Sequence, residues 1–185
     1  MPRTPGQRAG LTHDAVLTAA RTVFAQRGLP GLSMRSVAGE LGVAPNALYS
    51  HVADKTALVD ALLDDRLGAL TPPPPDADPV GGLRDVMLAT FDLLAAHPDL
   101  VPLYLARQGA RGPNARSLGA AMTVLLARAG VDSDAAGRVV RALIVSTLGY
   151  AALATADEAN LAPPQLRADL EVTLGWLLRG AIPRT

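Results

Sequence analysis

The sequence contains no cysteine, which rules out disulfide bonds and thiolate metal ligands. Its three histidines lie far apart, at positions 13, 51 and 97, and therefore predict no metal site. Only 3% of the 185 residues are aromatic, whereas 49% are hydrophobic. Apolar and polar residues rarely alternate, which disfavours β-strands. We therefore expect an all-α protein that holds no metal and no cofactor.

Charge is balanced over the whole chain but unevenly distributed. Seventeen basic and seventeen acidic residues give a formal net charge of zero, yet residues 1–59 hold six basic side chains against three acidic ones. This local excess favours contact with phosphates. The longest run without a charged residue, 142–156, has 15 residues, fewer than the roughly 20 of a membrane span. With no signal peptide evident, we expect a cytoplasmic protein without a membrane segment.

Proline and glycine divide the chain into parts. Residues 1–11 are expected to be a flexible arm, either a disordered tail or a segment that reaches a DNA minor groove. Residues 12–58 contain three short helical segments, and 83–185 are helical throughout, for about nine helices in all. Between them, 59–82 comprises a connecting helix and a proline-rich linker. Four consecutive prolines at 72–75 cannot continue a helix, so they mark a domain boundary or a rigid corner.

The N-terminal segment carries the start and stop signals of four helices. Thr12, Ser33 and Asp54 can each cap a helix N-terminus, and Gly28 suits the exit of the first helix. Nearer the C-terminus, Ser133 can cap a long helix that reaches about Thr155. Gly42 breaks the second helix, and Pro45 fits the first turn of the third. Two short helices around a glycine-containing turn, braced by a longer helix, form a helix-turn-helix.

The third helix exposes small polar residues. At about 100° per residue, Leu48 and Val52 define its buried side, and Asn46, Ala47 and Ser50 then point away from the core. A small, uncharged, polar surface on a short helix fits the floor of a DNA major groove.

Two cations occupy unfavourable positions, at helix N-termini. Lys55 and Arg35 both oppose a helix dipole, so intrahelical stability does not explain them. A phosphate bound there would meet a cation and free backbone N–H groups. The pair is either a phosphate clamp or two ordinary solvated charges.

The segment "AARTVFAQRGLPGLSMRSVAGELGVAPNALYSHVADKTALVDALL" resembles the DNA-binding region of TetR-family transcriptional regulators. The resemblance covers roughly residues 12–63 and rests on "S.R..A..LGV" and "LY.H...K..L". It implies a homodimer that binds a palindromic operator in double-stranded DNA. It also implies a helical domain whose small-molecule effector releases the DNA.

Carried over residue by residue, the resemblance assigns base reading to Pro45, Asn46, Tyr49 and Ser50. It assigns phosphate contacts to Arg35, Tyr49, His51 and Lys55. Ala44 departs from the family pattern, which often has a capping Ser or Thr there, and this leaves Asn46 as the best candidate to pair with adenine. Two structural interpretations stay open: the Tyr49 ring packs between helices, and the His51 imidazole closes the turn.

Larger side chains in the alanine- and leucine-rich C-terminal part either line a ligand cavity or fill the core. These are Met87, Phe91, Tyr104, Met122, Tyr150 and Trp176. Arg107 and Gln108 either orient a polar group of the ligand or lie on the surface.

The last two long helices combine apolar stripes with small residues that permit close approach. An exposed uncharged run at 142–156 would be costly in a monomer. We therefore expect these helices to form a four-helix dimer interface, with burial inside one subunit as the alternative. The predicted interface residues are Leu148, Ala151, Ala152, Leu170, Leu174 and Leu177.

The sequence has no nucleophile elbow, phosphate-cradling glycine loop or paired-carboxylate motif, so a helical enzyme is only a remote alternative. We expect a transcriptional regulator, a repressor released from its operator by an effector of unknown identity. The main alternative is a DNA-binding dimer that responds to a protein partner. A sizeable closed pocket favours the small molecule, whereas a filled core favours the partner.

Overall fold

The computed structural model describes residues 11–107, 109–156 and 160–183. Within these residues the all-α prediction is confirmed, because the chain forms eight α-helices, one 3-10 helix and no strand. The chain divides into two compact units, Met1–Leu62 and Leu63–Thr185. The division falls inside a continuous helix, α3 (Lys55–Leu67), and not in the proline-rich segment.

The first unit begins with a capped helix and a tight turn. The Ala15 N–H donates to the Thr12 hydroxyl at 3.1 Å, which confirms Thr12 as a cap. Regular helical geometry is interrupted at Gly28, where φ is 61° and the sequence predicted the helix exit. The helices of this unit are α1 (His13–Gly31), α2 (Met34–Leu41), the 3-10 helix η1 (Pro45–Ser50) and the start of α3.

Three local signals set the ends of α2 and the start of α3. The Ser33 and Ser36 side chains form a capping box, each accepting a hydrogen bond from the other's backbone N–H. Gly42, with φ of 66°, ends α2 in the left-handed conformation that glycine adopts most readily. The Asp54 carboxylate accepts from the Ala57 N–H at 2.8 Å and caps α3.

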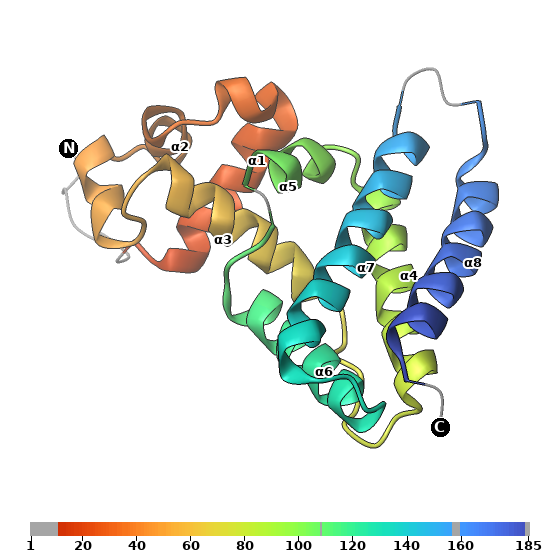
Figure 1. Ribbon diagram of the computed structural model, residues 1–185. Helices are drawn as coiled ribbons and strands as arrows, with labels where there is room; N and C mark the ends of the chain where they lie inside the picture. The colour runs from red at the N-terminus through yellow and green to blue at the C-terminus, as the bar shows by residue number, and fades with distance from the viewer. Residues whose placement is uncertain (1–10, 108, 157–159, 184–185) are drawn as a thin grey trace, which may run out of the picture. The chain divides into compact units, whose positions relative to one another are not determined.

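The second unit is a helical bundle in which α4, α7 and α8 lie side by side (Figure 1). Helix α6 packs against both α4 and α7. Helix α5 follows α4 after a bend of 119°, at a break that contains Pro98. Its helices are α4 (Pro79–Ala96), α5 (Leu100–Arg107), α6 (Pro113–Arg128), α7 (Ser133–Ala154) and α8 (Pro163–Ala181).

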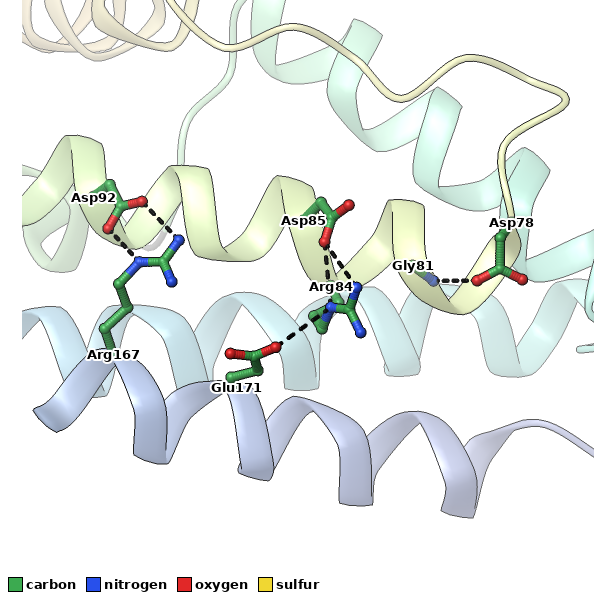
Figure 2. Close-up of polar contacts among 7 residues, drawn as sticks. All are labelled: Asp78, Gly81, Arg84, Asp85, Asp92, Arg167 and Glu171. Atoms are coloured by element: carbon green, nitrogen blue, oxygen red, sulfur yellow. Dashed lines mark hydrogen bonds and ion pairs between the residues drawn. The ribbon is translucent and has the colours of Figure 1, made fainter. Parts of the chain in front are cut away.

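Ion pairs cross the outer surface between α4 and α8 (Figure 2). The Arg167 guanidinium donates two hydrogen bonds to the Asp92 carboxylate, at 2.7 and 3.0 Å. Arg84 lies 3.8 Å from the carboxylate of Glu171. These pairs are largely exposed, so they add little stability and mainly fix which faces of the two helices meet.

The proline-rich segment is a corner within the second unit. The Arg128 guanidinium donates to the carbonyl oxygens of Pro75 and Ala77, both at 2.6 Å. Asp78 then caps α4 by accepting from the Gly81 N–H at 2.7 Å (Figure 2). The segment is therefore tied to α6 on one side and leads directly into α4 on the other.

A buried carboxylate joins α3 to α6 inside the second unit. Asp64 is only 5% exposed and accepts hydrogen bonds from the backbone N–H groups of Asn114, at 3.2 Å, and Ala115, at 2.8 Å. Helix α6 has no side-chain cap of its own, because Gly112 occupies the cap position. Asp64 thus supplies the negative charge and the acceptors that this helix N-terminus lacks.

One helix start differs from the sequence prediction. Ser133 was expected to cap the long helix α7, but the Asp132 carboxylate does so, accepting from the Ala135 N–H at 2.8 Å. Both residue types cap well, so the choice depends on backbone placement that local sequence does not determine.

Helix α7 is long and apolar enough to cross a membrane by length and composition, and the bent pair α4–α5 passes the same test when it is counted as one span. This is weak evidence for a membrane, since core helices of bundles have the same character. Helix α7 also packs against α4, α6 and α8.

Replacing Gly112 by alanine should destabilise the chain, because a Cβ atom at this position would overlap the Asp64 carboxylate. We expect a loss of about 1–3 kcal/mol in the free energy of unfolding, typical of overpacking. Gly119→Ala in the same helix is the matched control, since its Cβ would meet nothing within 4 Å. The control should gain up to about 1 kcal/mol from helix propensity. Denaturant unfolding measures both, and equal effects would contradict the steric role of Gly112.

Candidate functional site

The six residues of η1 turn one side chain inward and the others outward. Hydrogen bonds from the Ala47 N–H to the Ala44 carbonyl and from the His51 N–H to the Leu48 carbonyl, both 2.9 Å, give three residues per turn. Leu48 is the single buried residue of η1. Its neighbours form two exposed edges with three-residue spacing, one of Asn46 with Tyr49 and one of Ala47 with Ser50.

The two edges differ in the hydrogen-bonding groups that they leave open. The Asn46 amide makes no hydrogen bond within the described part of the chain, and Tyr49 is 53% exposed. The Ser50 hydroxyl donates to the Ala47 carbonyl at 3.1 Å, so its lone pairs stay available but its proton is used. About half of the Tyr49 side chain is accessible, so the ring is open to an outside partner, and its packing between helices stays a prediction.

The end of η1 is attached to the start of α1 by a backbone group of His51. Nδ1 of His13 lies 3.3 Å from the His51 carbonyl oxygen and donates to it in the tautomer with a proton on Nδ1. The carbonyl group of His51 makes this link, and its half-buried imidazole does not. Neither nitrogen of that ring makes a hydrogen bond with the described residues.

The two cations at helix N-termini are not equivalent. Lys55 is exposed, and its ammonium donates to the Leu29 carbonyl at 3.2 Å, which connects the start of α3 to the end of α1. Arg35 lies exposed in the first turn of α2 and makes no hydrogen bond or ion pair with the described residues. Arg35 is therefore the freer cation, whereas Lys55 also has a structural contact.

The second unit contains a cavity of about 810 Å³ among α4, α5, α6 and α7. It includes three of the predicted ligand residues, Met87, Tyr104 and Met122. The full lining is Leu67, Val86, Met87, Thr90, Leu94, Tyr104, Leu105, Gly109, Ala110, Ala115, Leu118, Gly119, Met122, Gly137, Val140, Arg141, Ile144, Val145, Thr147 and Leu148. The space among these four helices is therefore not completely filled by side chains.

The other four predicted ligand residues lie elsewhere. Phe91 is buried outside the cavity, and Arg107 is not part of the lining. The Tyr150 hydroxyl lies 2.9 Å from that of Thr173, between α7 and α8. Trp176 is 63% exposed, because it lies about 200° around α8 from an inward-facing leucine two residues earlier. Gln108 lies outside the described residues.

Sequence reasoning missed the polar lining of the cavity. Thr147 is fully buried and its hydroxyl has no hydrogen-bond partner in the described chain. Arg141 and Thr90 also line the cavity. Burial raises the pKa of the Tyr104 phenol, and a backbone hydrogen bond from Ala110 opposes this effect. One available signal was the position of Thr147, four residues from Leu143 and from Ala151 on a buried stripe.

Several predicted dimer-interface residues are core residues of one subunit. Ala151, Leu170 and Leu174 are completely buried within the chain, which contradicts their assignment to an interface with a partner. Leu148 lines the cavity, and Ala152 and Leu177 are half-buried. The apolar residues that α7 and α8 leave exposed are Val145, Leu153, Val172 and Trp176.

The match to a known protein family lies within the first unit of the chain. Residues 16–62 match the family model of bacterial regulatory proteins of the tetR family. The transcriptional repressor DrrR1 of Streptomyces coeruleorubidus is 38% identical over 106 residues, which make up 55% of this chain and 38% of that protein. The matched region, residues 16–62, belongs to the TetR family. The match of the chain to DrrR1 thus spans less than half of the length of DrrR1.

Solved TetR-family structures extend the similarity to both units. BioQ from Mycobacterium smegmatis has a TM-score of 0.80 at 23% identity, covering 93% of this chain and 98% of BioQ. BioQ in complex with its double-stranded DNA operator has a TM-score of 0.72 at 25% identity, covering 92% of this chain and 99% of that one. The family match at 16–62 contains all the predicted DNA contacts.

Proposed function

We propose that this TetR-family chain is a transcriptional repressor that binds operator DNA through the outer face of η1. The observation that carries the proposal is the burial of Leu48 alone in this segment, with its polar neighbours exposed. A narrow, uncharged polar ridge fits a major groove. The repressor name of DrrR1 and the operator complex of BioQ support the same function. The chain acts in the cytoplasm and not as an enzyme.

Within this proposal, Asn46 reads bases and its neighbours shape the contact. A free amide donates and accepts at once, which suits the two groups on the major-groove edge of adenine. Pro45 and Ser50 add apolar contact and an acceptor, because the Ser50 proton is already used. Tyr49, next to Asn46 on its edge, contributes its ring to base reading and its hydroxyl to a phosphate.

Two cationic side chains and one imidazole hold the phosphates of the DNA backbone. Arg35 has no competing partner in the described chain, so it is the strongest of these contacts. The His51 imidazole makes no hydrogen bond with the described residues and can contribute a further phosphate contact. Lys55 must share its ammonium protons between the Leu29 carbonyl and a phosphate, which it can do because an ammonium has three donors.

A homodimer would present two such faces to a palindromic operator. Helices α7 and α8 leave the large apolar side chains of Leu153, Val172 and Trp176 exposed outside the cavity, and we expect a partner subunit to cover them. We assign the dimer interface to this exposed face, which replaces the buried residues of the sequence prediction. Two-fold symmetry would then place the half-sites about one helical turn apart or slightly more.

A small molecule in the cavity of the second unit would act as the effector. The volume of about 810 Å³ lies in the range of ligand sites, and its presence favours a small molecule over a protein partner. Ala115 and Leu118 of α6 line this cavity, and the start of α6 is bonded to Asp64 of α3. A ligand that binds two arrangements of α6 unequally would therefore bias α3, the helix that continues into the first unit.

Asn46→Ala and Arg35→Gln should affect DNA binding in different ways. Loss of Asn46 should reduce discrimination at one base position by about 1–3 kcal/mol and leave the salt dependence unchanged. Loss of Arg35 should weaken binding to all sequences and lower the salt slope by about one. Fluorescence anisotropy with the operator, its single-base variants and random DNA, at several salt concentrations, measures both effects.

Arg116→Gln, an exposed charge on α6, is the matched control and should change neither quantity. A uniform loss of affinity in the Asn46 variant would contradict its role as a base reader. An unchanged salt slope in the Arg35 variant would remove this residue from the phosphate contacts.

Trp176→Glu should convert a dimer into a monomer, because it replaces a large exposed apolar side chain of the proposed interface by a charge. Sedimentation velocity at micromolar protein concentration measures the oligomeric state. Val124→Glu, an equally drastic change at an exposed site on α6, should leave the dimer intact. A monomeric wild-type chain would contradict the dimer, and dissociation by both variants would contradict this choice of interface.

A further inference from the structure

The cavity of the second unit contains a buried hydroxyl without a partner. Thr147 is 0% exposed, and its Oγ1 makes no hydrogen bond within the described chain. Several helical threonines donate to the carbonyl four residues earlier, as Thr90 does to Val86 at 2.7 Å and Thr123 to Gly119 at 2.9 Å. Buried polar groups are almost always paired. The Thr147 hydroxyl is therefore a hydrogen-bonding position that a cavity ligand can fill.

A second polar group lies in the buried part of the lining. The Tyr104 side chain is buried, and its oxygen has a backbone hydrogen bond from Ala110. An oxygen that accepts from an N–H keeps its own proton free to donate. Thr147 and Tyr104 therefore each offer a hydrogen-bonding group to a neutral oxygen atom of a ligand.

The described lining of the cavity carries one positive charge and no negative charge. Among its described residues there is no Asp, Glu, Lys or His, and Arg141 carries the single charge. Arg141 is exposed, as are Leu105 and Val145, so these three residues mark the rim of the cavity. The Arg141 guanidinium has no hydrogen bond or ion pair with the described residues. It is therefore free to pair with an anion from outside.

The two polar positions lie along one helix. Thr147 and Arg141 are six residues apart on α7, which corresponds to about 9 Å along the helix axis. The wall between and around them consists mainly of apolar side chains and glycine, including Met87, Met122 and Ile144. A ligand that uses both positions must be apolar in the middle and polar at both ends.

We infer that the cavity binds an amphipathic organic acid: its carboxylate pairs with Arg141 at the rim, its apolar body fills the cavity, and an oxygen at its far end bonds to Thr147. This inference rests on the proposed effector function and specifies the chemical class of the effector. A cationic ligand is disfavoured, because the described lining offers it no carboxylate and places a guanidinium at the rim. A sugar-like ligand would leave most of its hydroxyl groups without partners.

Isothermal titration calorimetry of the intact chain with four ten-carbon probes tests the inference. The probes are 10-hydroxydecanoate, decanoate, decanamide and decylammonium. We expect affinity to fall in that order, with the amine weakest. Arg141→Gln should weaken both acids about tenfold and leave the amide unchanged, since only the acids lose a charge-assisted contact. Arg138→Gln, an exposed arginine of α7 outside the lining, is the control.

The far end of the ligand is tested by Thr147→Val, which removes the hydroxyl and keeps the shape. This variant should bind 10-hydroxydecanoate severalfold more weakly and bind decanoate with unchanged affinity. Thr147→Ser should restore the difference in affinity between the two acids. Thr123→Val, at an exposed threonine of α6, is the control. A thermal melt of each variant verifies folding. Equal affinity for acid and amine, no response to Arg141→Gln, or no binding by any probe would overturn the inference.

Release of operator DNA, measured with the same probes, separates this inference from the proposed function. Binding of the acids with no DNA release would leave the ligand class standing and contradict the effector role. DNA release by the amine alone would preserve the effector role and overturn the ligand class.

Discussion

The first unit depends on a short 3-10 helix that is anchored by a single side chain. Leu48 is completely buried, and every other residue of η1 is exposed. Three residues per turn give such a helix one inward ridge and two outward edges. The caps at Ser33 and Asp54 fix the segments on either side, so the position of η1 depends on burial of one leucine between two rigid helix ends. The residues that reach DNA are free because so little of η1 is used for packing.

The second unit combines a filled bundle with two unfilled features. Helices α4, α7 and α8 bury a continuous set of leucines and Phe91, while α4, α5, α6 and α7 enclose the cavity. Helices α7 and α8 also leave an apolar face uncovered. A cavity and an exposed apolar patch both lower the stability of an isolated chain. We propose that a ligand occupies the cavity and that a second subunit covers the exposed apolar face.

Helix ends in the first unit were predicted well, because they depend on residues close in the sequence. Helix ends depend on nearby residues, so the caps at Thr12, Ser33 and Asp54 and the break at Gly42 were identified correctly. The α-helical spacing assumed for residues 45–50 was wrong, because a 3-10 helix forms there and places Tyr49 beside Asn46. The difference is about 20° per residue, which hydrophobic spacing in a six-residue segment cannot resolve.

Features that depend on packing between distant segments were predicted poorly. Leu174 was predicted at the dimer interface and Trp176 in the cavity or core, whereas the leucine is core and the tryptophan is exposed. The sequence indicated two apolar helices but not which neighbours cover which face. Thr147 and Arg141 gave no sequence motif, because their importance comes from the space between α5, α6 and α7. The buried Asp64 likewise meets residues about fifty positions away.

The central claim is that η1, presented twice by a dimer, reads double-stranded DNA. Selection of bound sequences from a random DNA library by the intact chain, followed by sequencing, tests it most directly. The account predicts an inverted repeat whose half-sites are centred about one helical turn apart or slightly more. Recovery of sequences with no shared inverted repeat, or no enrichment over the starting library, would contradict it.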